Sequence, residues 1–382
     1  MIKKSSLAWR FDKREFKYVK QVLDSGFASS TSGNMNSQLE KMFAKKFDSK
    51  FCITFNSGTT TLHAALESFG VGHGDEVIVT PLTVISCMNS IVYCNAVPIF
   101  VDIDENTFLM DPEKIEKKIT KKTKAILVVH LYGQVCDMTK IMKIAKKYNL
   151  YVLEDCAQCY LGKHKGKLGG TFGNVGSWSF ENSKHLTTGD GGIIACNNEK
   201  LGDRIRKFST QGFKNATAKS GKIRTDKSIF QNPNFKRHSQ LGYMYRMPEV
   251  AAAIGLGQLE KIEWFVRKRT KMAKYYSDVI KSLNCSWLVP QLVKNYDKNS
   301  YYTYAVKFLH KKIGWQQFRK KYIENGGDGI FAAWTLSYKE GSILDIVKRL
   351  KKLGISKQFK YYNGLCPVAE KIQPTLMQFT TN

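Results

Sequence analysis

Short apolar runs alternate with helical patterns over residues 51–155, and this alternation constrains the fold more than any other feature of the chain. The strand-like apolar runs cover 51–55, 76–80, 98–102, 125–130 and 151–155. The helical patterns between them include 62–69, 86–94, 112–119 and 138–148. Alternation of this kind predicts an α/β fold with a mostly parallel central sheet flanked by helices.

The rest of the chain carries weaker patterns. Helical periodicity covers 13–49, interrupted by Ser, Gly and Asn residues at 29–36, and it returns over 248–268. Residues 162–192 are glycine-rich and lack periodicity, and long irregular segments in compact domains tend to be functional. Residues 211–240 are polar and poorly patterned, which is typical of an excursion or an interface loop.

A chain of 382 residues exceeds the roughly 250–300 residues at which a single core stops growing. A second, smaller core is therefore expected, and the mixture of a short strand at 302–308 with helices indicates a small α+β domain. The predicted organisation is an N-terminal arm over 1–14, a large domain over 15–258 and a small C-terminal domain over 259–382.

The charge balance narrows the class of partner. A formal net charge of +28 raises the expectation of an anionic partner, such as nucleic acid or a phosphorylated substrate. The basic residues, however, are spread through helical stretches and form no long tract with interleaved aromatic residues. A lysine-rich, solvated surface is the favoured interpretation, and nucleic acid is not expected as a partner.

The sequence lacks the apolar runs of membrane spans and signal peptides. No run approaches the roughly 18 uninterrupted apolar residues of a membrane span, and the basic N-terminus lacks the apolar run of a signal peptide. A cytoplasmic location is therefore expected.

Among nine scattered cysteines, Cys156 and Cys159 form a Cys-x-x-Cys pair. Because no second pair lies at metal spacing, small buried side chains are favoured over a redox or zinc role, and no metal is expected.

The first candidate site follows the strand at 51–55. Ser57, Gly58 and Thr59 lie where the strand ends, a glycine turn follows and a helical pattern begins. Backbone N–H groups and the positive end of a helix meet at such a point, so this segment can cradle a phosphate. Capping of the helix by the hydroxyl groups explains the same residues equally well.

Two further candidates carry a charge. Asp155 ends the apolar run 151–155, at the edge where ligands of open α/β sheets bind, although it could equally cap a helix. Lys184 lies between an aromatic strand and the turn 189–192, amid uncharged polar residues. A lysine that is withdrawn from water becomes a nucleophile toward carbonyl groups, whereas composition alone favours an ordinary surface lysine.

Together the candidates match the needs of pyridoxal 5′-phosphate (PLP) chemistry: a lysine for an imine, an acid for the pyridine nitrogen and a cup for the phosphate. In sequence the chain resembles the DegT/DnrJ/EryC1/StrS family of sugar aminotransferases, from about residue 10 to its end. The matching segments are 56–66, 74–79, 101–104, 129–133, 154–158, Ser179-Phe180 with Lys184, 189–192 and 245–249.

The resemblance implies a fold-type I PLP-dependent transferase and a role for each matching residue. Lys184 would hold PLP as an imine and carry the proton between the two carbons of that imine. Asp155 would keep the pyridine nitrogen protonated, and Gln158 would contact the phenolic oxygen or the ring face. The phosphate would be bound by Ser57, Gly58, Thr59 and Ser179.

Three positions depart from the family's pattern. Val84 follows the Pro-x-Thr segment where members usually have an aromatic residue that stacks on the ring. Met244 stands where many members have an asparagine that reaches the phosphate of the neighbouring subunit. The chain also ends soon after 367–370, where members often continue with a further helix, so a short version of the family is expected.

The resemblance further implies a homodimer and a reaction in two halves. L-Glutamate would donate an amino group, and a keto group on a nucleotide-linked sugar would receive it. A family member that acts on a non-sugar cyclic ketone of the aminoshikimate type is the main alternative. In a PLP-dependent sugar dehydratase histidine replaces the lysine, so Lys184 argues against that activity. The remaining alternative is a basic binding protein that keeps the fold without catalysis.

Overall fold

The computed structural model describes residues 8–27, 35–223 and 227–381, which form two compact units. One unit combines residues up to Ser68 with Asn174–Phe265, and the other combines Phe69–Gly173 with the residues from Val266 onward. The predicted domain boundaries at residues 14 and 258 stay a prediction. Within the described ranges, no helix is both long and apolar enough to span a membrane.

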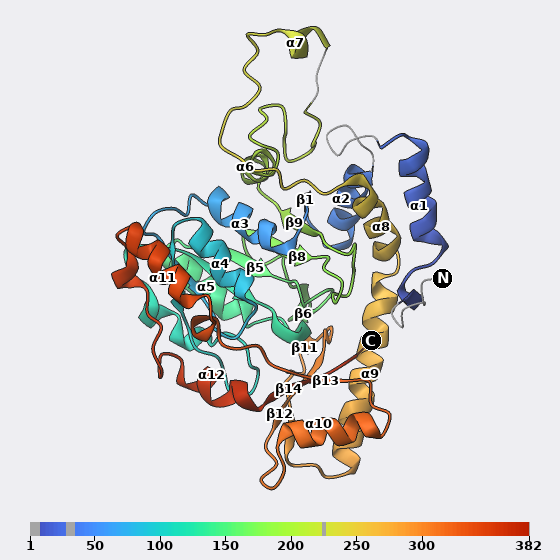
Figure 1. Ribbon diagram of the computed structural model, residues 1–382, viewed down its shortest axis with the longest axis vertical. Helices are drawn as coiled ribbons and strands as arrows, with labels where there is room; N and C mark the ends of the chain where they lie inside the picture. Colours follow the sequence, from blue (N-terminus) through green and yellow to red (C-terminus); the bar gives the residue numbers. More distant parts are fainter. Residues whose placement is uncertain (1–7, 28–34, 224–226, 382) are drawn as a thin grey trace. The chain divides into compact units, whose positions relative to one another are not determined.

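The first unit contains a group of antiparallel strands with helices around them (Figure 1). Strand β9 lies between β1 and β8 and pairs with both in the antiparallel direction. The elements are η1 (Ala8–Arg10), α1 (Lys13–Asp24), α2 (Met35–Lys46), β1 (Phe51–Phe55), α3 (Gly58–Ser68), β8 (Val175–Ser179), β9 (Gly192–Cys196), α6 (Glu199–Ser209), α7 (Lys227–Gln231), α8 (Glu249–Leu259) and the start of α9 (Ile262–Ser282).

Helices pack on both faces of these strands, as the contacts of alternate side chains along β8 show. Ser177 and Trp178 are neighbours, so their side chains point to opposite faces. The Ser177 hydroxyl lies 2.6 Å from the hydroxyl of Thr61 on α3. The Trp178 ring packs edge-on against Phe43 and Phe47 of α2, with centroid distances of 5.1 Å in both cases. Helix α3 therefore covers one face, and α2 covers the other.

The second unit contains the parallel part of the fold. Its strands pair in the order β5-β4-β2-β3, and all three pairings are parallel. The predicted α/β class with a mostly parallel sheet is thereby confirmed. The elements are β2 (Glu76–Val79), α4 (Ile85–Tyr93), β3 (Val97–Phe100), η2 (Pro112–Lys114), η3 (Glu116–Lys118), β4 (Thr123–Val129), η4 (Leu131–Gly133), α5 (Met138–Tyr148), β5 (Tyr151–Asp155), β6 (Lys163–His164) and β7 (Lys167–Leu168).

The C-terminal part of the second unit forms a separate antiparallel sheet in the order β10-β12-β14-β13. Its core includes Val306, Ile330, Met377 and Phe379, and Phe318 of α10 packs against it. The elements are β10 (Leu288–Pro290), β11 (Asp297–Lys298), β12 (Tyr304–Phe308), α10 (Trp315–Glu324), β13 (Ile330–Ala332), η5 (Ser337–Lys339), α11 (Ile343–Lys352), η6 (Ser356–Gln358), α12 (Pro367–Ile372), η7 (Gln373–Thr375) and β14 (Leu376–Phe379).

Three helix predictions differ from the structure. Helix α3 begins at Gly58, four residues before the expected start at 62, because polar residues fill its first turn. The segment 112–119 forms two short 3-10 helices without buried residues, and the buried Ile115 lies between them. The expected helix over 248–268 is divided between α8 and α9. Both helices are apolar near this break, so the periodicity does not reveal it.

The described parts of the predicted excursion, 211–223 and 227–240, are mostly loop and include the short helix α7 (Figure 1). The two segments at its base, 208–214 and 237–245, run side by side and form the stem of the excursion. The Gln211 N–H donates to the Tyr243 carbonyl at 3.0 Å, and the Ser239 N–H donates to the Gly212 carbonyl at 2.8 Å. A Cβ atom on Gly212 would lie 1.8 Å from the Gln240 carbonyl oxygen, and its φ is +76°, so only glycine fits there.

A fully buried carboxylate fixes the chain beside the end of β5. Glu154 accepts three backbone N–H groups from the segment 170–173, at distances between 2.6 and 2.8 Å. The Nδ1 atom of His130 accepts the Cys136 N–H at 3.2 Å, so the ring proton lies on Nε2. That nitrogen donates to Glu154 at 2.9 Å. The buried charge is thus matched by four donors, as burial of a carboxylate requires.

We expect Glu154→Gln to lower the free energy of unfolding by about 3 kcal/mol, because an amide N–H₂ would face backbone donors inside the protein. The measurement is urea unfolding followed by tryptophan fluorescence. Glu113→Gln is the control, since its side chain is 71% exposed and its ion pair with Lys140 is worth less than about 1 kcal/mol. Equal losses in the two variants would contradict this prediction.

Candidate active site

The predicted phosphate segment connects β1 to α3. Ser57 caps the helix, because its hydroxyl oxygen accepts the Thr60 N–H at 3.2 Å. Gly58 is the first helical residue and Thr59 the second, so their N–H groups lie at the N-terminal end of α3. The capping interpretation is thus correct for the Ser57 side chain. Capping and anion binding are compatible here, since they use different N–H groups of the same helix end.

Ser179 lies against this helix start. Ser179 and Ser177 are two positions apart on β8 and so face the same side, which is the side covered by α3. A Cβ atom on Gly58 would lie 2.6 Å from the Ser179 Cβ, so this close approach requires glycine. The Asn56 N–H donates to the Tyr245 carbonyl at 2.9 Å, which attaches the segment to the stem of the excursion. The structure therefore brings Gly58 and Ser179 together, while their binding of a phosphate stays a prediction.

Lys184 lies in the loop between β8 and β9. The loop is closed by main-chain hydrogen bonds, including the Phe180 N–H to the Gly191 carbonyl at 2.8 Å and the Lys184 N–H to the Glu181 carbonyl at 3.0 Å. Lys184 is half-buried, whereas Asn182 and Ser183 beside it are exposed. The main-chain carbonyl of Lys184 accepts a hydrogen bond from the guanidinium group of Arg10 at 2.5 Å.

Asp155 ends β5 and is 4% exposed. Its Oδ1 atom accepts the Ala157 N–H at 2.9 Å, and its Oδ2 atom accepts the Cys87 thiol at 3.2 Å. The Thr83 hydroxyl lies 3.2 Å from the same thiol. A nearly buried carboxylate with one weak thiol donor on Oδ2 retains the capacity to accept a stronger hydrogen bond, such as one from a protonated ring nitrogen.

Gln158 follows closely and is 5% exposed. Its side-chain carbonyl accepts the Tyr132 N–H at 2.8 Å. Tyr132 has a φ of +62° and is buried, so this hydrogen bond holds a residue in the left-handed region where non-glycine residues are uncommon. Gln158 therefore fixes the backbone after β4, and its amide nitrogen is the group left for a ligand.

The predicted residues fall into two sets. Ser57, Gly58, Thr59, Ser179 and Lys184 belong to the first unit, while Asp155 and Gln158 belong to the second. The first set has helix N–H groups and hydroxyls for a phosphate and an amine for an aldehyde, and the second set has a carboxylate for a ring nitrogen, as PLP requires. The residues fit the cofactor on this chemistry. The approach of Lys184 to Asp155 stays a prediction.

Two residues that depart from the family pattern can be placed in the structure. Val84 precedes α4 and is only partly buried, and its side chain makes no capping hydrogen bond. Met244 lies in the stem of the excursion, where it pairs with Thr210 in an isolated antiparallel bridge. Its side chain is 49% exposed. Neither residue supplies the aromatic ring or the amide that the family pattern leads one to expect.

Three supporting residues were not among those predicted from the sequence. Arg10 contacts the lysine loop, Cys87 contacts Asp155, and Glu154 holds the segment 170–173. Glu154 carried a signal, because a charged residue inside an apolar strand needs buried partners. Arg10 and Cys87 carried none, since their partners are distant in the sequence.

The Cys-x-x-Cys pair is buried. Burial raises the pKa of the Cys159 thiol to about 12 and that of the Cys156 thiol well above its ordinary value. The Cys159 thiol donates to the Gly133 carbonyl at 3.3 Å. Thiols with raised pKa values stay protonated at neutral pH and are poor nucleophiles and metal ligands. The structure thus favours the packing interpretation of both residues.

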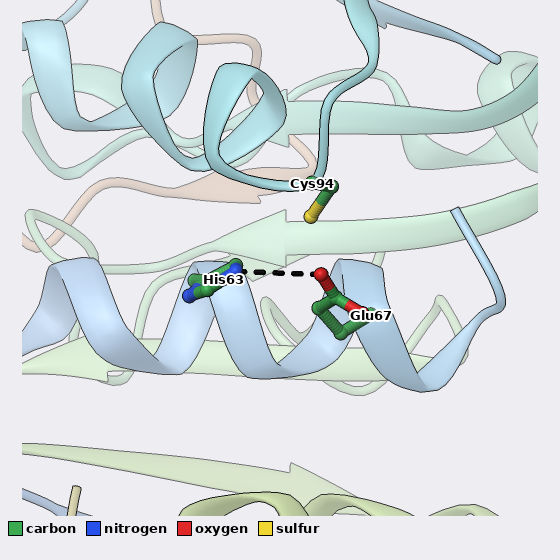
Figure 2. Close-up of side chains that lie close together, drawn as sticks. All are labelled: His63, Glu67 and Cys94. Atoms are coloured by element: carbon green, nitrogen blue, oxygen red, sulfur yellow. Dashed lines mark ion pairs between the residues drawn. The ribbon is translucent and has the colours of Figure 1, made fainter. Parts of the chain in front are cut away.

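His63 and Glu67 lie on successive turns of α3, with His63 Nε2 3.5 Å from the carboxylate (Figure 2). The other ring nitrogen lies 3.1 Å from the Tyr245 hydroxyl, and the His63 ring meets Phe208 edge-on at a centroid distance of 5.3 Å. His63 therefore connects α3 to α6 and to the stem of the excursion. These contacts help to fix the helix whose first residues form the predicted phosphate segment.

Comparison with known proteins supports the family resemblance. The DegT/DnrJ/EryC1/StrS aminotransferase family matches residues 10–328 of the chain. Among characterised relatives, the GDP-perosamine synthase of Escherichia coli O157:H7 is 42% identical over 270 residues, which are 71% of this chain and 69% of that protein.

Solved structures support the same fold. The aminotransferase from Psychrobacter cryohalolentis is 30% identical, with a TM-score of 0.84 over 97% of this chain and 92% of that one. NtdA from Bacillus subtilis with bound cofactor PMP is 26% identical, with a TM-score of 0.78 over 96% and 76% of the two chains. The predicted fold-type I architecture is confirmed. The chain belongs to the DegT/DnrJ/EryC1/StrS aminotransferase family and is a PLP-dependent aminotransferase.

Proposed function

We propose that the enzyme transfers an amino group from L-glutamate to a keto group of a nucleotide-linked sugar. The observation that carries this proposal is the 42% identity to a GDP-perosamine synthase, a protein whose name couples a nucleotide to an amino sugar. The net charge of +28 is compatible with a substrate that carries a pyrophosphate. A non-sugar cyclic ketone is the alternative acceptor, and no specific contact favours it.

The phosphate of PLP would be held by the segment at the start of α3. The N–H groups of Gly58 and Thr59 and the positive end of the helix attract a dianion, and the hydroxyls of Ser57 and Ser179 add donors. The close approach of Ser179 to Gly58 supports this assignment, because it gathers donors from two elements around one point. Fixed donors of this kind orient the cofactor before reaction.

Lys184 would hold the cofactor covalently through its Nζ atom and, once released, would carry a proton between the amino-bearing carbon of the substrate and the carbon of the cofactor that is joined to it through nitrogen. PLP supplies an electron sink that makes loss of this proton feasible. Once its amine is released, Lys184 acts as the base that takes the proton and as the acid that returns it. A single amine can serve in both halves of the reaction because each half needs one proton removed and one returned.

Asp155 would keep the ring nitrogen protonated, and Gln158 would bind the phenolic oxygen or the ring face. The low exposure of Asp155 supports its role, since a charge pair is stronger where water is excluded. The amide nitrogen of Gln158 supports the second role, because its carbonyl already accepts the Tyr132 N–H.

We also propose that the enzyme is a homodimer. Large apolar side chains are exposed on two parts of the first unit, residues 16–27 on and just after α1 and the stem of the excursion, and such exposure is typical of interfaces. They include Phe16 at 74%, Leu23 at 53%, Phe27 at 60% and Leu241 at 81% exposure. The cytoplasmic location expected from the sequence stays a prediction.

Lys184→Ala should abolish the visible absorbance of covalently held PLP and lower kcat/KM by at least about 10³-fold, because both the attachment and the proton transfer are lost. The measurement is a coupled assay with glutamate and a panel of keto-sugar nucleotides. Lys200→Ala removes an exposed lysine of the same unit and is the control. Wild-type turnover by Lys184→Ala would refute the role of Lys184, and inactivity of the wild-type enzyme on the whole panel would refute the proposed acceptor.

Asp155→Asn should lower kcat on the order of 10³-fold while the fold is retained, because an amide cannot stabilise the protonated ring nitrogen. The measurement combines steady-state kinetics with far-ultraviolet circular dichroism. Asp345→Asn is the control, since the Asp345 side chain is 83% exposed. If Asp155→Asn and its control have the same kcat, Asp155 has no part in the reaction.

Leu241→Asp should shift the enzyme from dimer to monomer, because it introduces a charge into a surface expected to be buried on association. Size-exclusion chromatography with light scattering measures the change. Leu344→Asp on α11 is the control, since Leu344 is 63% exposed and lies in the second unit, outside the set of residues proposed to associate. A monomeric wild-type protein, or a dimeric Leu241→Asp variant, would contradict the assignment of this interface.

A further inference from the structure

The lysine loop is held by an arginine that lies 174 residues away in the sequence. Arg10 is 4% exposed and donates to three main-chain carbonyls around Lys184. Its Nη1 atom lies 2.8 Å from the Asn182 oxygen, and its Nη2 atom lies 2.5 Å from the Lys184 oxygen and 3.2 Å from the His185 oxygen. The guanidinium group therefore spans the loop on both sides of the lysine.

A guanidinium group suits this position for a geometric reason. Its planar fork offers five N–H donors in fixed directions, whereas an ammonium group offers three donors on a flexible stem. Carbonyls at 182, 184 and 185 point to one place because the turn reverses the chain between Phe180 and Gly191. Hydrogen bonds to partly buried carbonyls are costly to lose, so these three bonds stabilise the loop.

Arg10 is itself fixed from the other side. Its main-chain carbonyl accepts Lys261 Nζ at 2.9 Å and Gln258 Nε2 at 2.8 Å. Glu15 binds both of these donors, each at 2.7 Å, and is 4% exposed. The Arg10 guanidinium also lies 5.7 Å from the centre of the Phe265 ring. These contacts leave little freedom to the arginine, so it can transmit rigidity from α8 and the start of α9 to the loop.

We propose that Arg10 is a positioning residue for Lys184: its guanidinium fixes the loop main chain so that the Lys184 amine is presented to the cofactor. This inference rests on the proposed covalent role of Lys184. Arg10 acts through the backbone, and it needs no contact with PLP or substrate. Misplacement of a reacting group by about 1 Å costs on the order of 100-fold in rate.

The test compares covalent and non-covalent binding of the cofactor. Apoprotein is mixed with PLP, and stopped-flow absorbance follows formation of the imine between Lys184 and the aldehyde carbon, with loss of water. Binding of pyridoxamine 5′-phosphate, which has no aldehyde, is measured by quenching of tryptophan fluorescence. We expect Arg10→Ala to slow imine formation about 100-fold and to change the Kd of pyridoxamine 5′-phosphate less than about threefold.

Arg14→Ala is the matched control, because it removes an arginine from the same segment. Its side chain is 44% exposed and pairs with Asp12 at 3.0 Å. We expect this variant to form the imine at the wild-type rate. Arg10→Lys keeps the charge but loses the fork, and it should slow imine formation roughly tenfold with a melting temperature close to that of the wild type.

The outcomes separate the inference from the proposed function. Imine formation at the wild-type rate in Arg10→Ala would overturn the positioning role. If Arg10→Ala does not fold, Arg10→Lys decides: a slowed imine with unchanged pyridoxamine 5′-phosphate binding supports the role, and a wild-type rate overturns it. An equal loss of both kinds of binding would also overturn it, because a general disturbance would then explain the effect. Failure of the wild-type protein to form an imine would instead refute the covalent role of Lys184.

Discussion

The period-two alternation of side chains along its strands is the constraint on which the rest of this structure depends. On β5, Glu154 and Asp155 are neighbours and so point to opposite sides. Glu154 accepts four hydrogen bonds inside the protein and holds the segment 170–173. Asp155 presents its carboxylate to Cys87 and the expected ligand side. Packing and chemistry thus use opposite faces of one strand.

Strand β8 divides its residues in the same way. Trp178 fills the core against α2, whereas Ser177 and Ser179 face α3. The absence of a side chain at Gly58 lets Ser179 approach the helix start, so the proposed phosphate segment has donors from two elements. The chemistry of this family needs fixed donors, and here they are fixed by a strand and a helix end rather than by a flexible loop.

Unlike the candidate site residues on strands and at the helix end, Lys184 lies on a loop. Its neighbours Asn182 and Ser183 are exposed, and turn hydrogen bonds alone provide limited support. Arg10 supplies an anchor from outside the loop, and Glu15, Gln258 and Lys261 hold that anchor in place. On the positioning role that we propose for Arg10, the N-terminal segment would help to orient the amine, although nothing in its local sequence indicates such a role.

The sequence by itself determined the elements and the residue types of the site. Alternating apolar runs predicted β1 to β5 and the α/β class, and the strand-to-helix junction at Gly58 and the lone lysine before 189–192 located two candidate segments. These signals depend on neighbours within a few positions, so they can be read without coordinates. The break between α8 and α9 leaves no such signal, because apolar residues continue on both sides of it.

Only the tertiary structure decided that Arg10 binds the carbonyls at 182, 184 and 185, that Cys87 binds Asp155 and that His130 binds Glu154. Such contacts join residues 24 to 175 positions apart, and their partners are selected by the packing of whole helices and strands rather than by local pattern.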